Sequence, residues 1–203
     1  DVVLANSNNG KKRLKKYLNV DAEILSPPCD TSYEGKDSKG YFLSTARVEP
    51  LKRVDMIVEA FMQMPEKQLI VMSGGSQLEE LKEKAKRHKN ITFTGWVTEK
   101  EKRKLIAHCE ATIYIPKDED FGMSPIESIS AGKPVIGVAE GGLLETISYN
   151  TGILLSKEEV NTCGIIDIVW NDKYPNISTS PHNGNECYSY SIIQFIKNIS
   201  LRL

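Results

Sequence analysis

The stretch "ATIYIPKDEDFGMSPIESISAGKPVIGV", residues 111–138, decides the fold class of this chain. The apolar runs at its two ends have the length and composition of buried β-strands. Between them, Ser124-Pro125 predicts the start of a helix, because serine is favoured as an N-cap and proline at the first helical position. Gly132 is typical of a helix end. A strand, a helix and a second strand in this order predict a parallel βαβ unit.

The same alternation continues on both sides of this unit. Charged amphipathic segments separate further short apolar runs, which predict strands at 2–5, 23–26, 41–45, 68–72, 91–94 and 152–155. Strands such as "QLIVM" (68–72) are apolar at almost every position, which is typical of strands covered on both faces. We therefore predict an α/β fold: a Rossmann-like parallel sheet with helices on both faces.

Composition excludes several functional classes. The chain has 203 residues, enough for one substantial domain with an appendage, and a formal net charge of −1, which gives no general attraction to nucleic acid. No apolar run approaches the roughly 18 residues that span a bilayer, and no secretory signal pattern opens the sequence. The four cysteines contain no Cys-x-x-Cys pair, which argues against a zinc site. These features favour a cytoplasmic protein.

The amino-acid composition changes after about residue 157. Charged residues become sparser, Asn, Ser and Tyr become more frequent, and "NDKYPNISTSPHNGNECYSYS" has neither helical nor strand periodicity. We predict a ligand-binding domain over residues 1–157 and an atypical tail over 158–203, partly loop or disordered, with a terminal helix near its end.

Ligands of open parallel sheets bind at the carboxyl ends of the strands, and the loop after residue 115 occupies such a position. The amides of Phe121, Gly122 and Met123 would lie at a helix N-terminus, where an anion such as phosphate is favoured. Glu127 completes a Ser-x-x-Glu capping box, which alone explains that residue. Glu119 has no evident capping partner, although most loop carboxylates are simply solvated.

Two further clusters fall on the same predicted edge. Arg47 and Lys52 follow the 41–45 strand and suit a diphosphate, although a surface ion pair with Glu49 or Asp55 would also explain them. Gly141-Gly142 follows the 134–138 strand, where bare amides can meet phosphate or simply form a tight turn. Each cluster is weak alone. Together they place anion donors and carboxylates on one edge, the set that a nucleotide sugar requires.

The segment "EDFGMSPIESISAGKPVIG...GGLLETI" resembles the E-x7-E region of the retaining, family-4-type glycosyltransferases of the GT-B fold. "ARVEPLKRVDMIVEAF" is similar to the Arg…Lys segment of the same family. The variant present here looks most like the mannosyltransferase branch that builds surface polysaccharides. The resemblance spans roughly residues 1–157.

The resemblance implies a role for each matching residue. Glu119 would contact the donor sugar, Glu127 would hold the ribose hydroxyls, and the fixed cations would neutralise the leaving diphosphate. The implied catalytic residues are Glu119, Arg47 and Lys52, and the implied donor-binding residues are Glu127, Phe121, Gly122, Met123, Gly141, Gly142, Trp96 and Val97. The donor would be GDP-mannose or a UDP-sugar, with no cofactor and no bound metal.

The resemblance also implies what the chain lacks. Enzymes of this family have two Rossmann-like domains, and this sequence looks like the donor-binding half, without the N-terminal domain that binds most of the acceptor. The acceptor would be a glycan or a lipid-linked sugar. The basic stretch 11–18 would then suit a peripheral membrane contact, although a solvated helix face explains it equally. The sequence departs from the family at Lys52-Arg53, where Lys-Gly is common, and at Ser73, where a glycine is expected.

Three alternatives remain at this stage. The chain would be a non-catalytic or split subunit if a separate N-terminal domain were needed for turnover. A glycosidase would use Glu119 and Glu127 as a carboxylate pair, but phosphate-type donors are unnecessary for hydrolysis. A nicotinamide-dependent dehydrogenase is disfavoured, because no G-x-G-x-x-G follows the early strands.

Overall fold

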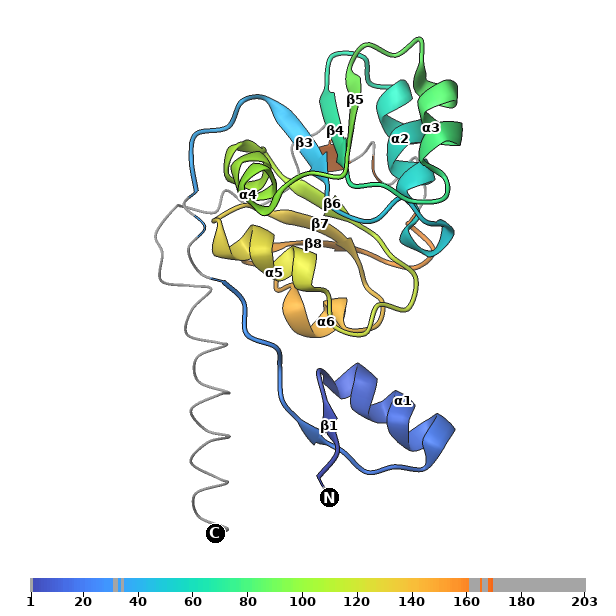
Figure 1. The fold of residues 1–203 in the computed structure, drawn as a ribbon, viewed down its shortest axis with the longest axis vertical. Coiled ribbons are helices and arrows are strands. Elements are labelled where there is room, and N and C mark those ends of the chain that lie inside the picture. Colours follow the sequence, from blue (N-terminus) through green and yellow to red (C-terminus); the bar gives the residue numbers. More distant parts are fainter. Residues whose placement is uncertain (1, 31–32, 34, 161–164, 166–167, 170–203) are drawn as a thin grey trace.

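The computed structural model describes residues 2–30, 33, 35–160, 165 and 168–169. Within them, six parallel strands form one sheet in the order β5-β4-β3-β6-β7-β8 (Figure 1). The strands are β3 (Tyr41–Ser44), β4 (Gln68–Met72), β5 (Ile91–Gly95), β6 (Thr112–Tyr114), β7 (Val135–Val138) and β8 (Gly152–Leu155). The predicted Rossmann-like parallel sheet is confirmed.

Helices cover both faces of this sheet, as predicted. The helix α2 (Val54–Met62) packs with α3 (Leu78–Ala85) on one face, and α4 (Glu99–His108) packs with α5 (Met123–Ser130) on the other (Figure 1). A short 3-10 turn, η1 (Pro50–Lys52), precedes α2, and a short helix, α6 (Leu143–Thr146), follows β7. Thr98 and Glu101 form the predicted capping box that begins α4.

The alternation of side chains along β3 shows how the two faces are filled. Phe42 and Leu43 point to opposite sides, because successive residues of a strand do so. Phe42 belongs to the larger hydrophobic cluster with Phe61 of α2, and their rings lie 5.6 Å apart. Leu43 belongs to the smaller cluster with Ile106 of α4. Buried apolar side chains on both faces therefore hold the sheet between its helices.

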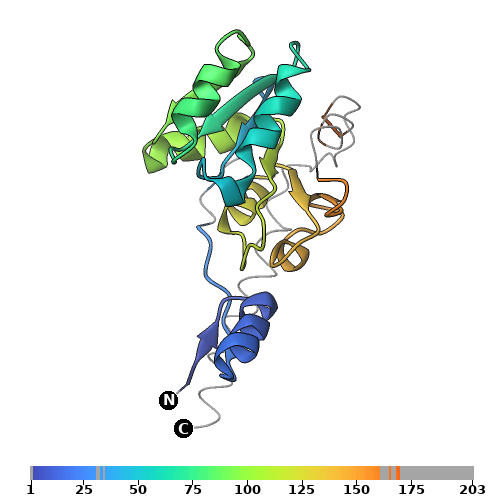
Figure 2. The ribbon, with the colours of Figure 1, turned by 90° about the vertical axis from the view of Figure 1, so that its right-hand side faces the viewer.

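The prediction of a single sheet was wrong for the first two strands. β1 (Leu4–Ala5) and β2 (Glu23–Ile24) pair with each other in parallel and, with α1 (Asn8–Leu18), form a separate βαβ unit below the main body (Figures 1 and 2). Leu4 and Glu23 are exposed, so these strands lack the two buried faces of a central strand. A long connection, residues 25–40, then leads to β3.

The predicted boundary at residue 157 stays a prediction, and most of the predicted tail, including its terminal helix, lies outside the described residues. Val160, Ile165, Ile168 and Val169 are buried in the larger hydrophobic cluster. The core therefore includes side chains beyond residue 157. No helix within the described ranges is long and apolar enough to cross a membrane.

Ser73 follows β4 with a φ of +88°, in a region that residues other than glycine rarely adopt. Its amide donates to the carbonyl oxygen of Gly95 at 2.8 Å, which ties the ends of β4 and β5 together. The glycine expected at this position by resemblance would adopt the same backbone without strain.

We expect Ser73→Gly to raise the free energy of unfolding by about 1 kcal/mol. Relief of a strained positive φ contributes on the order of 1–3 kcal/mol, and the greater conformational entropy of glycine in the unfolded chain offsets part of it. Thermal unfolding of the variant would show a higher Tm. Ser73→Ala is the matched control, because alanine keeps the strain; an equal gain from alanine would contradict the explanation.

Candidate functional site

The strand order places the site. From β3 the chain passes through α2 to β4, on one side of the sheet. From β6 it passes through α5 to β7, on the other side. The connections of these two neighbouring strands therefore diverge, and a crevice opens at their carboxyl ends. Lys52 lies in the loop after β3 and Glu119 in the loop after β6. The sheet thus brings together two predicted residues that are far apart in sequence.

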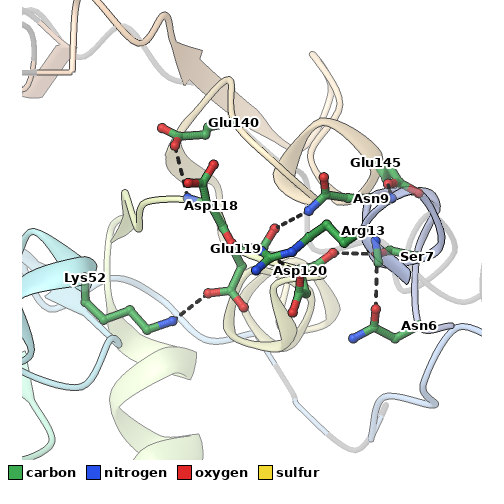
Figure 3. Close-up of polar contacts among 11 residues, drawn as sticks. Asn6, Ser7, Asn9, Arg13, Lys52, Asp118, Glu119, Asp120, Glu140 and Glu145 are labelled. Atoms are coloured by element: carbon green, nitrogen blue, oxygen red, sulfur yellow. Dashed lines mark hydrogen bonds and ion pairs between the residues drawn. The ribbon is translucent and has the colours of Figure 1, made fainter. Parts of the chain in front are cut away.

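Lys52, Glu119 and Tyr114 form a compact polar cluster at this point (Figure 3 shows Lys52 and Glu119). Lys52 Nζ lies 2.6 Å from Glu119 Oε2, and the Tyr114 hydroxyl donates to the same oxygen at 2.7 Å. The side chains of Lys52 and Glu119 are only 22% and 18% exposed, so the ion pair is largely shielded from water. The alternative explanation of Glu119 as a solvated loop carboxylate therefore does not hold.

Opposing effects act on the Glu119 carboxyl. Burial raises its pKa, but hydrogen bonds from Lys52 and Tyr114 outweigh burial and hold the pKa below its usual value. The pKa of the Tyr114 hydroxyl is raised strongly, first by burial and then by the Glu119 charge. At neutral pH the cluster therefore holds an ionised carboxylate, a lysine and a neutral phenol.

A cavity of about 520 Å3 lies against this cluster. Arg47 lines it together with Lys52 and Glu119, and Arg13 of α1 also lines it. The Arg47 guanidinium forms no ion pair within the described ranges, whereas Glu49 is engaged by the backbone and hydroxyl of Ser76. The alternative of Arg47 and Lys52 pairing with Glu49 or Asp55 is therefore wrong, and both cations face one cavity.

The start of α5 differs from the sequence prediction. Gly122, with a φ of +91°, is the N-cap, and the helix begins at Met123, so Ser124 and Pro125 lie inside the first turn. The predicted capping box is absent; Glu127 instead accepts from Lys102 Nζ at 2.8 Å. The first-turn amides beginning at Met123 have no intrahelical acceptor. Gly132 does end the helix in a left-handed conformation, as predicted.

The pair of Lys102 and Glu127 is a second shielded contact, at 21% and 18% exposure. Burial lowers the pKa of Lys102, but hydrogen bonds to Glu127 and Glu99 outweigh it and raise the pKa overall. Glu119 and Glu127 are therefore held by different lysines. This arrangement argues against the glycosidase alternative, in which both carboxylates would face one glycosidic bond.

Gly141 and Gly142 lie against the backbone of the Glu119 loop. A Cβ atom on Gly141 would meet the carbonyl oxygen of Glu119 at 2.3 Å, and one on Gly142 would meet that of Asp120 at 2.2 Å. The Gly142 amide donates to the Glu119 carbonyl at 2.8 Å. The prediction of bare amides is therefore wrong for Gly142: close backbone approach requires these glycines, and they hold the loop in place.

Trp96 and Val97 line a different cavity, of about 450 Å3, beside α4. The indole of Trp96 is 73% exposed and lies against Gly74, where an added Cβ would meet Nε1 at 2.5 Å. None of the residues lining this cavity lines the one at Lys52. The structure therefore brings Arg47, Lys52 and Glu119 together. It places Trp96 and Val97, from the segment that the resemblance implies to face the nucleobase, apart from them.

Sequence analysis missed a buried pair that supports the site. Arg53 has a φ of +52°, the conformation expected of the family's glycine, and its Nη1 lies 3.3 Å from Glu140 Oε2. Glu140 is 3% exposed and also accepts from the Asp118 amide at 3.0 Å. The Lys-Arg departure from the family's Lys-Gly was the available signal. The described residues contain no cluster of three or more His, Cys, Asp or Glu that could hold a metal ion.

The family description "Glycosyl transferases group 1" matches residues 31–168, well over half of the chain. The chain belongs to the group 1 glycosyltransferases. Its fold is the Rossmann-like half of a GT-B glycosyltransferase, as the resemblance implied.

Several curated relatives are named as mannosyltransferases. The alpha-1,3/1,6-mannosyltransferase ALG2 of Dictyostelium discoideum is 31% identical over 85% of this chain and 53% of its own length. The human protein of the same name is 26% identical over 79% of this chain and 48% of its own length. The chain thus spans about half the length of these relatives.

Solved structures agree on the fold. The structure of Anabaena HepE in complex with UDP and glucose aligns with 98% of this glycosyltransferase chain and 62% of the HepE chain. The TM-score is 0.76 and the identity is 17%. Sucrose-phosphate synthase from Thermosynechococcus elongatus covers 100% of this chain and is matched over 59% of its own, with a TM-score of 0.77 and 18% identity.

We expect Lys52→Met to raise the pKa of Glu119, because burial is then opposed mainly by hydrogen bonding from Tyr114. A carbon-13 NMR titration of the carboxyl measures this directly. An unchanged pKa would contradict the assigned ion pair.

The pH dependence follows from the sign of the shift. In the wild type the folded pKa lies below the unfolded value, so the pair stabilises the fold at pH above about 4.3 and loses that effect as pH falls through the folded pKa. The difference in unfolding free energy between wild type and Lys52→Met should therefore shrink on acidification from pH 7.

Proposed function

We propose that this domain binds a nucleotide-diphosphate sugar as the donor half of a retaining hexosyltransferase that transfers mannose to a glycan or a lipid-linked acceptor. The observation that carries the proposal is the cluster at the carboxyl ends of β3 and β6. There, Lys52 and Arg47 face one cavity beside the Glu119 carboxylate. Cations suit a diphosphate, and a carboxylate suits sugar hydroxyls.

The cluster suggests how a donor would be received. Lys52 is paired with Glu119, so an incoming diphosphate would compete with that carboxylate for the ammonium group. Glu119 would then be released to accept hydrogen bonds from the donor sugar. Arg47, which has no ion pair to break within the described residues, would meet the diphosphate first.

Negative charge would accumulate on the diphosphate as its bond to the sugar breaks. Fixed cations oriented before the reaction stabilise such charge without reorganisation, and we assign this role to Arg47 and Lys52. They would supply the neutralisation that a divalent cation supplies in other transferases, so the proposal includes no bound metal and no further cofactor. Glu127, beside Lys102, would bind the ribose hydroxyls.

The choice of donor rests on the relatives. Several are named as mannosyltransferases, and one as a mannosylfructose-phosphate synthase, which favours mannose and hence GDP-mannose. The Anabaena structures contain UDP or UDP-glucose, so a UDP-sugar is the competing donor. Trp96 and Val97 remain the proposed nucleobase segment, although their cavity is separate from the one at Lys52.

We further propose that turnover requires a second, acceptor-binding domain, because the chain spans only about half of its curated relatives. That domain would be the N-terminal half of the GT-B fold. A split protein whose two halves associate is the alternative form of the same proposal, and both require the donor site described here.

Calorimetric titration of GDP and UDP into the chain tests the proposal. We expect one of them to bind with a dissociation constant in the millimolar range or lower. Lys52→Ala should weaken binding at least about tenfold, because a charge-assisted hydrogen bond is worth roughly 1.5–3 kcal/mol. Lys100→Ala removes an exposed lysine of α4 and is the matched control.

Two carboxylate variants separate the assigned roles. Glu127→Gln should weaken binding of the nucleoside diphosphate itself, whereas Glu119→Gln should weaken only the additional affinity that the sugar contributes. Absence of binding by either nucleotide would contradict the proposal.

We also propose that α1 contacts a membrane surface. Lys11, Lys12, Lys15 and Lys16 project from it, with Tyr17 and Leu18 exposed beside them, so the helix would rest on an anionic membrane in a cytoplasmic, membrane-associated enzyme. Cosedimentation with anionic vesicles should fall in Lys11→Ala/Lys15→Ala; equal binding by wild type to neutral vesicles would contradict an electrostatic contact.

A further inference from the structure

Helix α1 contacts the loop that carries Glu119 through three consecutive backbone carbonyls. Arg13 Nη1 donates to the Asp118 carbonyl at 3.2 Å, and Asn9 Nδ2 donates to the Glu119 carbonyl at 3.1 Å (Figure 3). Just before the helix, the Ser7 hydroxyl donates to the Asp120 carbonyl at 2.6 Å. Each donor therefore fixes one residue of the loop.

Arg13 makes a second contact with the same loop. Its Nη1 also lies 3.0 Å from a carboxylate oxygen of Asp120, so one guanidinium group contacts both the backbone and a side chain (Figure 3). The planar arrangement of its donors makes arginine suited to such shared contacts. The loop is thus held from the α1 side by groups with defined direction.

The turn after β7 holds the opposite side of the loop. The Gly142 amide donates to the Glu119 carbonyl, which Asn9 also contacts, and Glu140 accepts from the Asp118 amide. Asp118 has a φ of +50°, an uncommon conformation that persists only where surrounding contacts impose it. The orientation of Glu119 therefore depends on contacts from both sides.

The contact between α1 and the body is polar. Neither hydrophobic cluster of the described residues includes a residue from β1, α1 or β2. Instead, the Glu145 carboxylate of α6 accepts from the Asn8 and Asn9 amides, each at 2.8 Å, and so caps α1 (Figure 3). Packing of the core thus contributes little to the position of α1, and directional hydrogen bonds set it.

We propose that Asn9 and Arg13 are positioning residues, which hold the Glu119 carboxylate beside Lys52 and toward the donor sugar. They act through the backbone of residues 118–120, not by touching the reacting atoms. Loss of their hydrogen bonds leaves Asp118 held mainly by Glu140, so its uncommon conformation is less firmly imposed and the next residue, Glu119, can shift. The part of this inference that concerns the sugar rests on the proposed function; the part that concerns Lys52 does not.

The first experiment needs no ligand. The pKa of the Glu119 carboxyl is measured by carbon-13 NMR in the full chain for wild type, Asn9→Ala/Arg13→Ala and Lys12→Ala. The double variant should raise the pKa by about one unit, because the carboxylate leaves its cation. Lys12 forms no hydrogen bond or ion pair among the described residues, so Lys12→Ala removes the adjacent charge without freeing the loop.

The outcomes of this experiment decide the first part. An unchanged pKa in the double variant, or an equal rise in Lys12→Ala, would overturn the proposal. Arg13→Lys keeps a cation near Asp120 but loses the guanidinium fork. It should therefore raise the pKa of Glu119 by less than the double variant does. If the double variant fails to fold, Asn9→Ser and Arg13→Lys are measured separately, and each is then expected to raise the pKa of Glu119.

The second experiment uses calorimetry with the free nucleoside diphosphate and the corresponding nucleotide sugar. The double variant should bind the nucleoside diphosphate within about twofold of wild type but lose the added affinity for the sugar, the same result that is expected of Glu119→Gln. Arg13 also lines the cavity at Lys52, so direct contact with the diphosphate is the competing explanation. A tenfold loss of nucleoside diphosphate affinity would establish that contact and overturn the positioning role.

The two experiments fail independently. If the wild type binds no nucleotide, the proposed function fails, while the pKa of Glu119 still decides whether Asn9 and Arg13 position it. If nucleotide binds normally and the pKa is unchanged in the variants, the proposed function stands and this inference is overturned.

Discussion

Connections between parallel strands are right-handed, so the helices that follow β3 and β6 lie on opposite faces of the sheet and their preceding loops separate. This geometry creates the crevice in which Lys52 meets Glu119, which lies 67 positions further along the sequence. The 2.6 Å ion pair, with the Tyr114 hydroxyl on the same oxygen, is the chemical consequence. The position of Arg47 and the family's expected donor chemistry both depend on that crevice.

The fold could be predicted because its signals are local or periodic. The five-residue strand 68–72 and the capping box at Thr98 have sequence patterns with direct physical causes, burial and amide capping, and both are observed. The strands at 2–5 and 23–26 show the limit of such patterns. A short apolar run predicts a strand but does not specify which sheet it joins, and here the first two form their own.

The candidate site could be predicted only in part, and the reason is physical. Ser124-Pro125 is a favourable helix start, yet α5 begins at Met123 with Gly122 as its N-cap. The loop enters the helix with a positive φ at Gly122, which the Ser-Pro pattern does not report. Glu127 then finds its partner 25 positions away, in Lys102. The contacts of Asn9 and Arg13 were equally invisible, since their acceptors are backbone carbonyls, which every residue possesses.

The ion pair that lines the cavity has a consequence for selectivity among anions. A bare lysine at the carboxyl edge of a sheet would attract any phosphate in solution, whereas Lys52 already has an internal carboxylate as its partner. A small anion must displace Glu119 with little binding energy to offset the exchange. A ligand that also provides hydroxyl groups gives the displaced carboxylate new donors. The pair would thus act as a built-in counterion for Lys52, so that displacing Glu119 costs a small anion more than it costs a ligand that also brings hydroxyl groups.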